Sequence, residues 1–155
     1  MKPLFPKDKL KEIHRHALAE YPEECCGIII GKEGDDREDV LFQCSNIQNK
    51  LHAMDPQTYT RDARTAFYID PRELMKIFKE ADKRQMGVKF FYHSHPDHDA
   101  YFSDEDKRVA LFEGEPVYPG AGHLVVSVYN GTIKENVLYT WNSDKKAFEE
   151  SPETG

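Results

Sequence analysis

The stretch VKFFYHSHPDHDAYFSDED, residues 88–106, carries the strongest signals of fold and function in this 155-residue chain. Its first eight residues include aromatic and β-favouring side chains and predict a strand that contains His93 and His95. Because side chains alternate along a strand, the two imidazoles project from the same face. A loop follows, and Ser103 begins a short helix that is predicted to run to about Phe112.

Two imidazoles on one face of a rigid strand predict a metal site. Zinc takes histidine nitrogens at roughly 2.0–2.1 Å and needs a third protein donor, with one position left for water if the site is catalytic. Composition alone does not choose that donor, but Asp106 is favoured because the first turn of a helix holds it rigidly. The full set of candidates is Asp97, His98, Asp99, Asp104, Glu105 and Asp106.

Each of these features also has an ordinary structural interpretation. Two histidines on a strand can be surface residues or hydrogen-bonded core residues. Ser103 and Asp106 form S-x-x-D, a capping box that begins a helix. His98 is expected to lie at the rim of the site or in solvent rather than to act as a fourth ligand. The remaining histidines lack ligand spacing and are predicted to be structural or surface groups: His14, His16, His52 and His123.

The complete string, HSHP at residues 93–96 followed after six residues by S-x-x-D, resembles the JAMM (MPN+) motif of the Mov34/PAD-1 zinc metallopeptidases. The resemblance implies that His93, His95 and Asp106 hold one zinc ion with a bound water. It implies that Ser103 donates a hydrogen bond to the developing oxyanion. It also implies an α/β fold of the JAMM/MPN type, similar to cytidine deaminases, with a mixed, mostly antiparallel sheet flanked by helices.

A second motif lies upstream, where PEECCG at residues 22–27 resembles the P-x-E-x-C-G signature of the small bacterial and archaeal members. Matched residue by residue, Glu24 falls on the catalytic glutamate and Glu23 on the variable position. The resemblance therefore implies that Glu24 takes a proton from the water and passes it to the leaving amine. The alternative is that these adjacent acids only mark a solvated junction between a helix and a strand.

The resemblance covers nearly the whole chain and is to the small, Mec+-like prokaryotic branch of the family. It implies hydrolysis of the peptide bond after the C-terminal Gly-Gly of a ThiS/MoaD-type ubiquitin-like sulfur carrier, which releases cysteine or a C-terminal extension. The chain has no insertion large enough for a dedicated ubiquitin-docking domain, which favours this substrate class. One departure is Phe102, where many relatives have proline, and it is expected to alter the pocket wall rather than the metal ligands.

Three alternatives stay open. The chain can be an isopeptidase of the deubiquitinase type. It can also be a phage-tail or cell-wall JAMM peptidase, although those usually accompany a second peptidase domain for which these residues leave no room. A non-enzymatic MPN scaffold is the third alternative, and the complete motif speaks against it.

The first half of the chain predicts a helix, a hairpin and a loop. Apolar residues from Leu10 to Tyr21 recur at helical spacing. Residues 25–31 and 39–46 then predict two strands of a hairpin. Residues 47–65 are polar with little periodicity and predict a loop. Its basic residues, Lys50, Arg61 and Arg64, suggest a segment that closes over the carrier tail and meets acidic groups of the carrier.

The second half predicts a further helix and the closing strands. Residues 66–70 predict a short strand, and Asp70-Pro71 is a strong helix start. Residues 123–130 and 133–141 predict a hairpin around Asn130-Gly131. A last short strand is expected near residues 147–149. Residues 1–150 are expected to form a single JAMM/MPN+ domain, with residues 151–155 as a frayed tail.

Composition and charge restrict the partners and the location. A net charge of -7 argues against a nucleic-acid partner. No apolar run is long enough to span a membrane, and the N-terminus lacks the features of a signal peptide, so a cytoplasmic location is expected. The three cysteines, Cys25, Cys26 and Cys44, are expected to be reduced and mostly buried. Proteins of this fold often pair, so a homodimer is one expected state.

Overall fold

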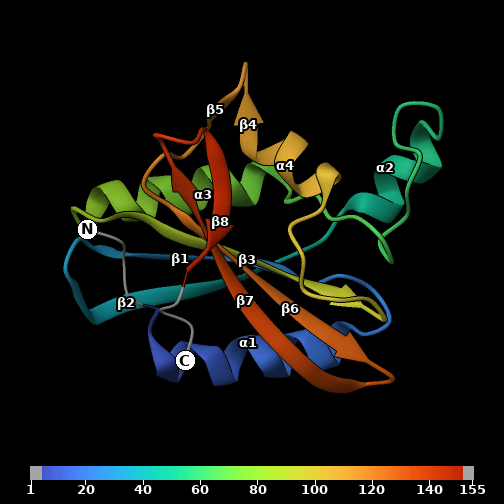
Figure 1. Ribbon diagram of the computed structural model, residues 1–155, viewed down its shortest axis with the longest axis horizontal. Coiled ribbons are helices and arrows are strands. Elements are labelled where there is room, and N and C mark those ends of the chain that lie inside the picture. The colour runs from blue at the N-terminus through green and yellow to red at the C-terminus, as the bar shows by residue number, and fades with distance from the viewer. Residues whose placement is uncertain (1–4, 152–155) are drawn as a thin grey trace.

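Strand β3 (Gly87–Pro96) contains the predicted strand VKFFYHSH and lies inside a six-stranded sheet in the computed structural model (Figure 1). The structure describes residues 5–151. The strand order is β2-β1-β3-β6-β7-β8, and the other strands are β1 (Cys26–Lys32), β2 (Asp35–Cys44), β6 (Gly122–Tyr129), β7 (Thr132–Asn142) and β8 (Ala147–Glu150). Only β3 and β6 pair in parallel within this sheet, which confirms the predicted mixed, mostly antiparallel arrangement.

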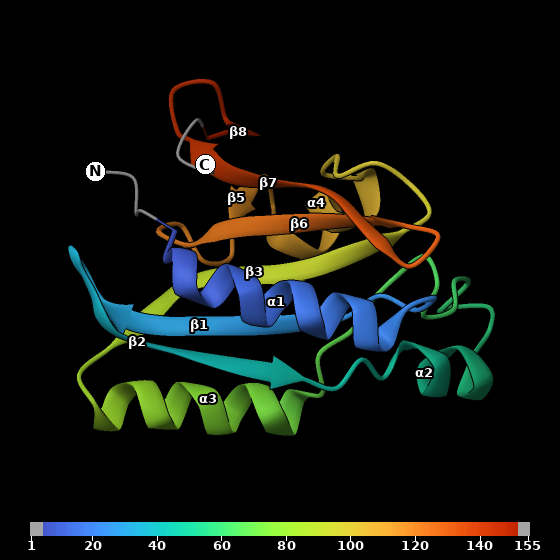
Figure 2. The same cartoon turned by 90° about the horizontal axis from the view of Figure 1, so that it is seen from below.

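Helices cover both faces of the sheet (Figures 1 and 2). They are α1 (Lys7–Glu20), α2 (Gln48–Met54), α3 (Pro71–Lys83) and α4 (Asp104–Ala110). Ile13 of α1 packs in one core cluster with Phe90 and Tyr92 of β3, whereas α3 packs in a second cluster on the opposite face. Because side chains alternate along β3, His93 and His95 face the side of the sheet that α3 and α4 cover.

The cysteines follow the same alternation. Cys25 lies in the core cluster with α1, and Cys26 lies in the cluster with α3, as expected for neighbours on a strand. Cys44 lies beside Cys26, because the two residues are register partners on β1 and β2. All three are free and buried, which confirms the predicted reduced, buried thiols. Burial raises the pKa of Cys25 and of Cys44 to about 12, so neither thiol is reactive near neutral pH.

Several predicted boundaries hold because local chemistry determines them. Asp70 caps α3 by accepting a hydrogen bond from the backbone N–H of Arg72, and Pro71 occupies the first helical position. The turn between β6 and β7 contains Asn130 and Gly131 at φ of 54° and 76°, the left-handed values that a two-residue hairpin requires. The predicted last strand is also present as β8.

Two predictions in the middle of the chain are wrong. Residues 47–65 are not an uninterrupted loop, because residues 48–54 form α2. Ile47 gives this helix no capping side chain, and long-range contacts such as Gln48 Nε2 donating to the Arg61 carbonyl (2.9 Å) hold it in place. Residues 66–70 are not a strand of the sheet, because their one bridge in the described structure joins Ile69 to Asn46.

The helix that begins after Ser103 is shorter than predicted. It ends at Ala110, and Leu111–Phe112 form β4, which pairs with β5 (Glu115–Pro116). Glu113 and Gly114 between these strands have φ of 52° and 79°, so a tight hairpin replaces the last helical turn.

The C-terminal end of the described chain is held in place. The backbone N–H of Ser151 donates to the Leu138 carbonyl (2.7 Å), and Ser151 is buried. The rest of the predicted frayed tail, residues 152–155, lies outside the described residues. Across residues 5–151, none of the helices is both long and apolar enough to cross a membrane.

Gly27 of the PEECCG stretch is sterically required, which predicts a stability effect. A Cβ at this position would overlap the ring of Tyr92, which is 1% exposed and is fixed by its hydroxyl contact with His16 Nδ1 (2.7 Å). We expect Gly27→Ala to lower the free energy of unfolding by about 1–3 kcal/mol, as overpacked core positions do, measured by urea denaturation.

Gly87 supplies the matched control for this prediction. It lies at the exposed start of β3, and a Cβ there would meet no atom within 4 Å. Gly87→Ala should therefore change the free energy of unfolding by less than about 0.5 kcal/mol. Equal effects of the two substitutions would contradict the steric role of Gly27.

Candidate metal centre

The structure brings His93, His95 and Asp106 together in a buried group. The Nε2 atoms of the two histidines lie 3.2 Å apart. Asp106 Oδ2 lies 3.1 Å from His93 Nε2 and 3.2 Å from His95 Nε2. Tetrahedral ligands at roughly 2.0–2.1 Å from zinc lie about 3.3 Å from one another, so this nearly equilateral triangle has the dimensions of one face of a zinc site.

The hydrogen-bond chemistry of His95 also fits a cation. Its Nδ1 lies 2.7 Å from the backbone carbonyl oxygen of Asp99, which only accepts, so Nδ1 carries the proton. In the neutral ring the lone pair of Nε2 then points at His93 and Asp106. A single proton can form a hydrogen bond between only two of the three atoms, His93 Nε2, His95 Nε2 and Asp106 Oδ2. A metal ion can bind all three atoms at once. The group can therefore bind a metal, and two nitrogens with one carboxylate suit zinc.

The start of α4 holds Asp106 in position. Ser103 Oγ accepts the Asp106 N–H, and Asp106 Oδ2 accepts the Ser103 N–H, both at 3.0 Å, so the predicted capping box is present. The capping box and the metal-ligand interpretation are compatible, because the oxygen that caps the helix also faces the histidines. Burial alone would raise the pKa of Asp106, but His93 and His95 outweigh it and hold the pKa well below its ordinary value.

Glu24 lies next to this group and is buried, not solvated. Cys26 and His93 are register partners, and Ser94 N–H donates to the Cys25 carbonyl, so antiparallel pairing places Glu24 opposite His95. Glu24 is 2% exposed, and its Oε1 has no hydrogen-bond partner among the described residues. Burial, followed by the charge of Asp106, raises the pKa of Glu24 well above its ordinary value.

Glu23 differs from its neighbour. It is half-buried, and its Oε2 accepts a hydrogen bond from Asn49 Nδ2 (2.8 Å). Of the two adjacent acids, Glu24 is therefore the one whose carboxyl retains an unused acceptor atom beside the candidate ligands.

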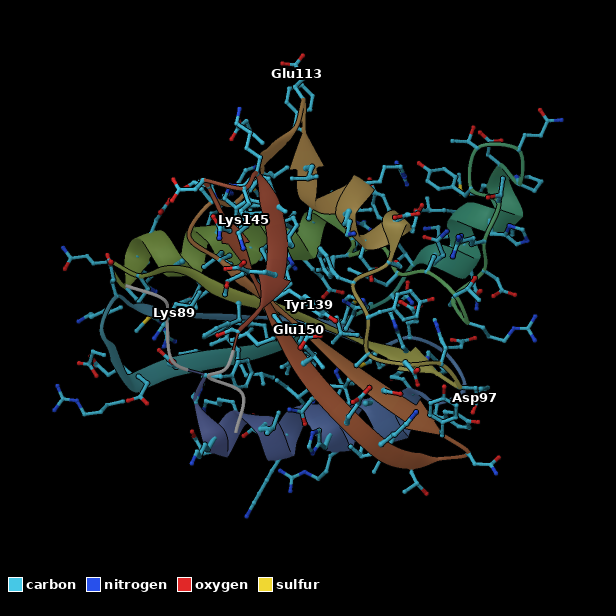
Figure 3. The ribbon with its side chains drawn as sticks, viewed as in Figure 1. Lys89, Asp97, Glu113, Tyr139, Lys145 and Glu150 are labelled. Carbon is cyan, nitrogen blue, oxygen red and sulfur yellow. The ribbon has the colours of Figure 1, made fainter. Side chains whose placement is uncertain are left out.

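The other candidate donors of this stretch have partners elsewhere. Asp97 accepts from the Tyr21 hydroxyl and from the Asn130 N–H, beside the tip of the β6–β7 hairpin (Figure 3). The side chain of Asp99 binds Lys134 (2.6 Å), and that of Glu105 binds Arg108 (2.6 Å). Asp104 is exposed. Only Asp106 joins the histidines, which agrees with the donor that the sequence favours.

The remaining histidines lie outside the metal group. His98 stacks in parallel on His95, with ring centroids 4.3 Å apart, and so lies at the edge of the site as expected. Its Nε2 is buried and has no partner among the described residues. His14, His16 and His52 bond to Asn136, Tyr92 and the Tyr59 carbonyl, respectively, and His123 packs against aromatic rings.

The sequence predicted a loop over residues 47–65 that closes over a carrier tail, but it did not reveal how the segment of residues 61–67 contacts the site. Its Ala63 carbonyl accepts the Glu24 N–H (2.7 Å), and at its other end the Phe67 ring stacks on His93 at 4.6 Å between centroids. Asn46 Nδ2 links this segment to Glu24 by donating to the carbonyls of Glu24 (2.9 Å) and Ala66 (3.2 Å). This segment therefore forms one side of the site, between Glu24 and His93. No residue spacing in the sequence predicts these contacts.

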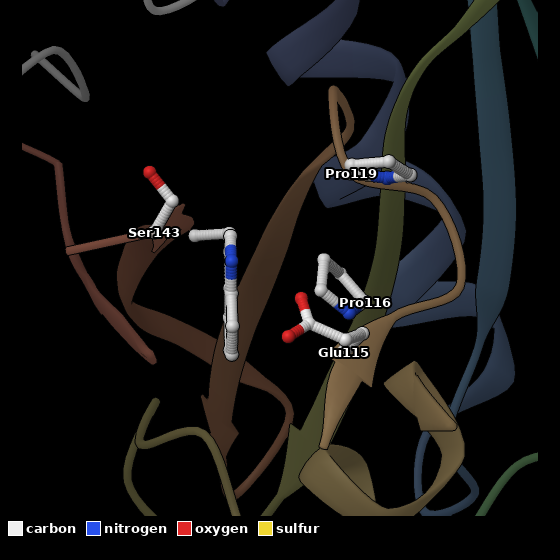
Figure 4. A pocket seen from close by; sticks show the side chains of 5 residues that line it. Glu115, Pro116, Pro119 and Ser143 are labelled. Carbon is white, nitrogen blue, oxygen red and sulfur yellow. The ribbon is translucent and has the colours of Figure 1, made fainter. Parts of the chain in front are cut away.

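A separate pocket of about 470 Å³ lies between β5 and the end of β7 (Figure 4). Its lining residues are Glu115, Pro116, Pro119, Trp141 and Ser143. None of them belongs to the metal group, and Glu115 is the only acid among them, so this pocket is not a second metal site.

The mixed sheet with its buried His-His-Asp group defines an α/β protein with a candidate metal site that matches the JAMM motif. The chain belongs to the prokaryotic homologs of the JAB domain, whose family pattern matches residues 6–142. This membership confirms the family resemblance carried by the HSHP and S-x-x-D motifs.

Individual relatives agree with this assignment. The chain is 27% identical over 120 residues to proteins named CysO-cysteine peptidase from Mycobacterium tuberculosis and Mycobacterium bovis, covering 77% of this chain and 69% of theirs. A solution structure from Desulfitobacterium hafniense has a TM-score of 0.66 at 26% identity, covering 94% of this chain and 86% of its own. One from Salinibacter ruber has a TM-score of 0.60 at 26% identity, covering 97% and 88%.

Proposed function

We propose that the protein is a zinc-dependent peptidase that hydrolyses the peptide bond after the C-terminal Gly-Gly of a ubiquitin-like sulfur carrier. One observation carries the proposal: the buried Glu24 carboxyl, with an unpartnered oxygen, beside the three potential metal ligands. A buried carboxyl without a partner is costly for stability, and such groups occur where chemistry needs them. A scaffold that only keeps the fold would have no use for this arrangement.

The proposed ligands of the zinc ion are His93, His95 and Asp106. When bound, zinc supplies Lewis acidity, which polarises a carbonyl and lowers the pKa of water. The Asp99 carbonyl fixes the tautomer and ring orientation of His95, as outer-shell partners of metal-binding histidines commonly do. The Ser103 N–H and the start of α4 orient Asp106.

Two residues are proposed to act on the substrate itself. Glu24 takes a proton from the attacking water and delivers it to the nitrogen of the leaving amine, so that water is consumed and the peptide bond becomes an acid and an amine. Burial and the charge of Asp106 raise the pKa of Glu24, which favours acceptance of a proton from water. Ser103 Oγ accepts the Asp106 N–H, which leaves its O–H proton free to donate to the developing oxyanion.

The names of the relatives support the proposed substrate class. The curated mycobacterial proteins are named for cleavage of CysO-cysteine, and they match over 77% of this chain. Transferred to this protein, that name suggests a carrier whose C-terminal residue is removed as a free amino acid. We propose that residues 1–150 carry this activity as one domain.

The substrate proposal predicts a direct result. The zinc-loaded protein should remove cysteine from a ThiS/MoaD-type carrier that ends in Gly-Gly-Cys, and mass spectrometry should show a carrier shortened by one residue. Added chelator should stop the reaction, and readded zinc should restore it.

Controls separate the alternatives. Cleavage of a Gly-Gly isopeptide in preference to the Gly-Gly-Cys carrier would favour the isopeptidase alternative. Zinc binding without cleavage of either would contradict the proposed substrate, and absence of zinc binding would favour the scaffold.

A further inference from the structure

Arg61 lies at the wall of the proposed active site. Gln48 fixes its backbone, and its guanidinium Nη1 donates to the Thr65 carbonyl (3.3 Å). The side chain thus lies along the segment between Ala63, which bonds to Glu24, and Phe67, which stacks on His93. Arg61 is exposed to solvent, so a substrate can reach it.

The positive charge of Arg61 acts on the buried acid of the site. Burial is the main cause of the raised pKa of Glu24, and Arg61 is the positive group that acts against it. The position of Arg61 follows from its hydrogen bonds, because its carbonyl accepts from Gln48 Nε2 and its Nη1 donates to the Thr65 carbonyl within the segment that contacts Glu24 and His93.

Arg61 differs from the other arginines nearby because it has no carboxylate partner among the described residues. Arg64 forms an ion pair with Asp62 (2.9 Å), and Arg108 forms one with Glu105 (2.6 Å). Within residues 5–151 the Arg61 side chain donates to one neutral group, the Thr65 carbonyl. Its charge and most of its donors are therefore available to a ligand.

The chemistry of the proposed reaction identifies that ligand. Glu24 hands a proton to the leaving nitrogen, and in an amino acid released from a C-terminus only one carbon separates this nitrogen from the α-carboxylate. The carboxylate must therefore sit close to Glu24, in a neighbourhood that already contains Glu105 and Asp106. Zinc offsets the charge of Asp106 when it is bound, but the charges of Glu24 and Glu105 would still repel the carboxylate unless a further cation lies nearby.

We propose that Arg61 binds the free α-carboxylate of the amino acid that is released, and so selects substrates with an unmodified C-terminus. This inference rests on the proposed peptidase function. A planar guanidinium can bind a carboxylate through two parallel hydrogen bonds. An isopeptide-linked lysine leaves through its ε-amine and carries no carboxylate near the scissile bond, so Arg61 disfavours isopeptide substrates relative to a C-terminal residue.

The test compares three substrates made from one sulfur carrier. The first ends in Gly-Gly-Cys as the free acid, the second carries a C-terminal amide, and the third joins Gly-Gly to a lysine ε-amine in a short peptide. We expect the zinc-loaded wild type to prefer the free acid by about tenfold in kcat/KM over either of the others, the size of one charge-assisted hydrogen bond.

Substitutions then test whether Arg61 causes the preference for the free acid. Arg61→Gln should remove it by slowing cleavage of the free acid while leaving the amide nearly unchanged, and Arg61→Lys should retain part of it. Arg64→Gln, in the same segment but paired with Asp62, should keep the wild-type ratio. Binding can be measured without turnover in a protein that carries Glu24→Gln. Fluorescence anisotropy should then give a lower Kd for the free-acid carrier than for the amide.

The outcomes separate this inference from the proposed function. Equal cleavage of acid and amide by the wild type, or an equal loss on both in Arg61→Gln, overturns the role of Arg61 and leaves the peptidase intact. Failure of the zinc-loaded wild type to cleave any of the three overturns the proposed function and this inference with it.

Discussion

Asp106→Ala should leave the protein almost free of zinc, whereas the wild type should hold about one ion per chain. The substitution removes one of three proposed ligands and leaves His93 and His95 without the carboxylate that both face. The loss of affinity should exceed the roughly 10–100-fold that removal of an outer-shell partner costs. Elemental analysis after dialysis against a fixed zinc activity measures it.

Two companion variants separate metal loss from helix loss. Asp106→Asn keeps an amide oxygen that can accept the Ser103 N–H, so it should preserve the capping box and the thermal stability of α4 while still weakening zinc binding. Asp104→Ala changes an exposed acid in the same helical turn and should retain the ion. A zinc-replete, active Asp106→Ala protein would remove Asp106 from the ligand set.

The part of the site that sequence could predict is the part with local periodicity. His93 and His95 share a face because they are two residues apart on a strand, and the structure keeps that geometry. The choice of Asp106 among six candidate donors needed the family spacing. The structure shows why local geometry was insufficient: Asp97 and Asp99 are held by Tyr21 and Lys134, which are 76 and 35 residues away in sequence.

The part that sequence could not predict depends on long-range contacts. The α2 helix has no capping side chain and contains only seven residues, so its formation depends on hydrogen bonds to residues after it. The segment that packs against Glu24 and His93 likewise has no periodicity. Because this segment packs against Glu24, Glu24 is buried whereas Glu23 is half-buried. Burial of the two adjacent glutamates cannot be distinguished from their residue type alone.

Glu24→Gln should keep its zinc and lose turnover by about 10²–10⁴-fold, the usual contribution of a positioned general base. The substitution preserves the size of the side chain and removes only its ability to take and return a proton. Zinc content should stay unchanged, because Glu24 lies outside the group of three potential ligands. Single-turnover cleavage of the carrier substrate and elemental analysis of the same sample measure both quantities.

The free energy of unfolding of Glu24→Gln distinguishes a catalytic role of Glu24 from a structural one. In the wild type, one oxygen of Glu24 is buried without a partner and the carboxyl is desolvated, so a neutral amide should leave the free energy of unfolding unchanged or raise it.

Glu23→Gln is the matched control. The Glu23 carboxylate accepts from Asn49 and is half-buried, so its loss should leave turnover within a few-fold of wild type. A structural role for Glu24 predicts the opposite result, a less stable protein that remains active in proportion to its folded fraction. Full activity in Glu24→Gln, or a large loss in Glu23→Gln alone, would transfer the proton-carrying role away from Glu24.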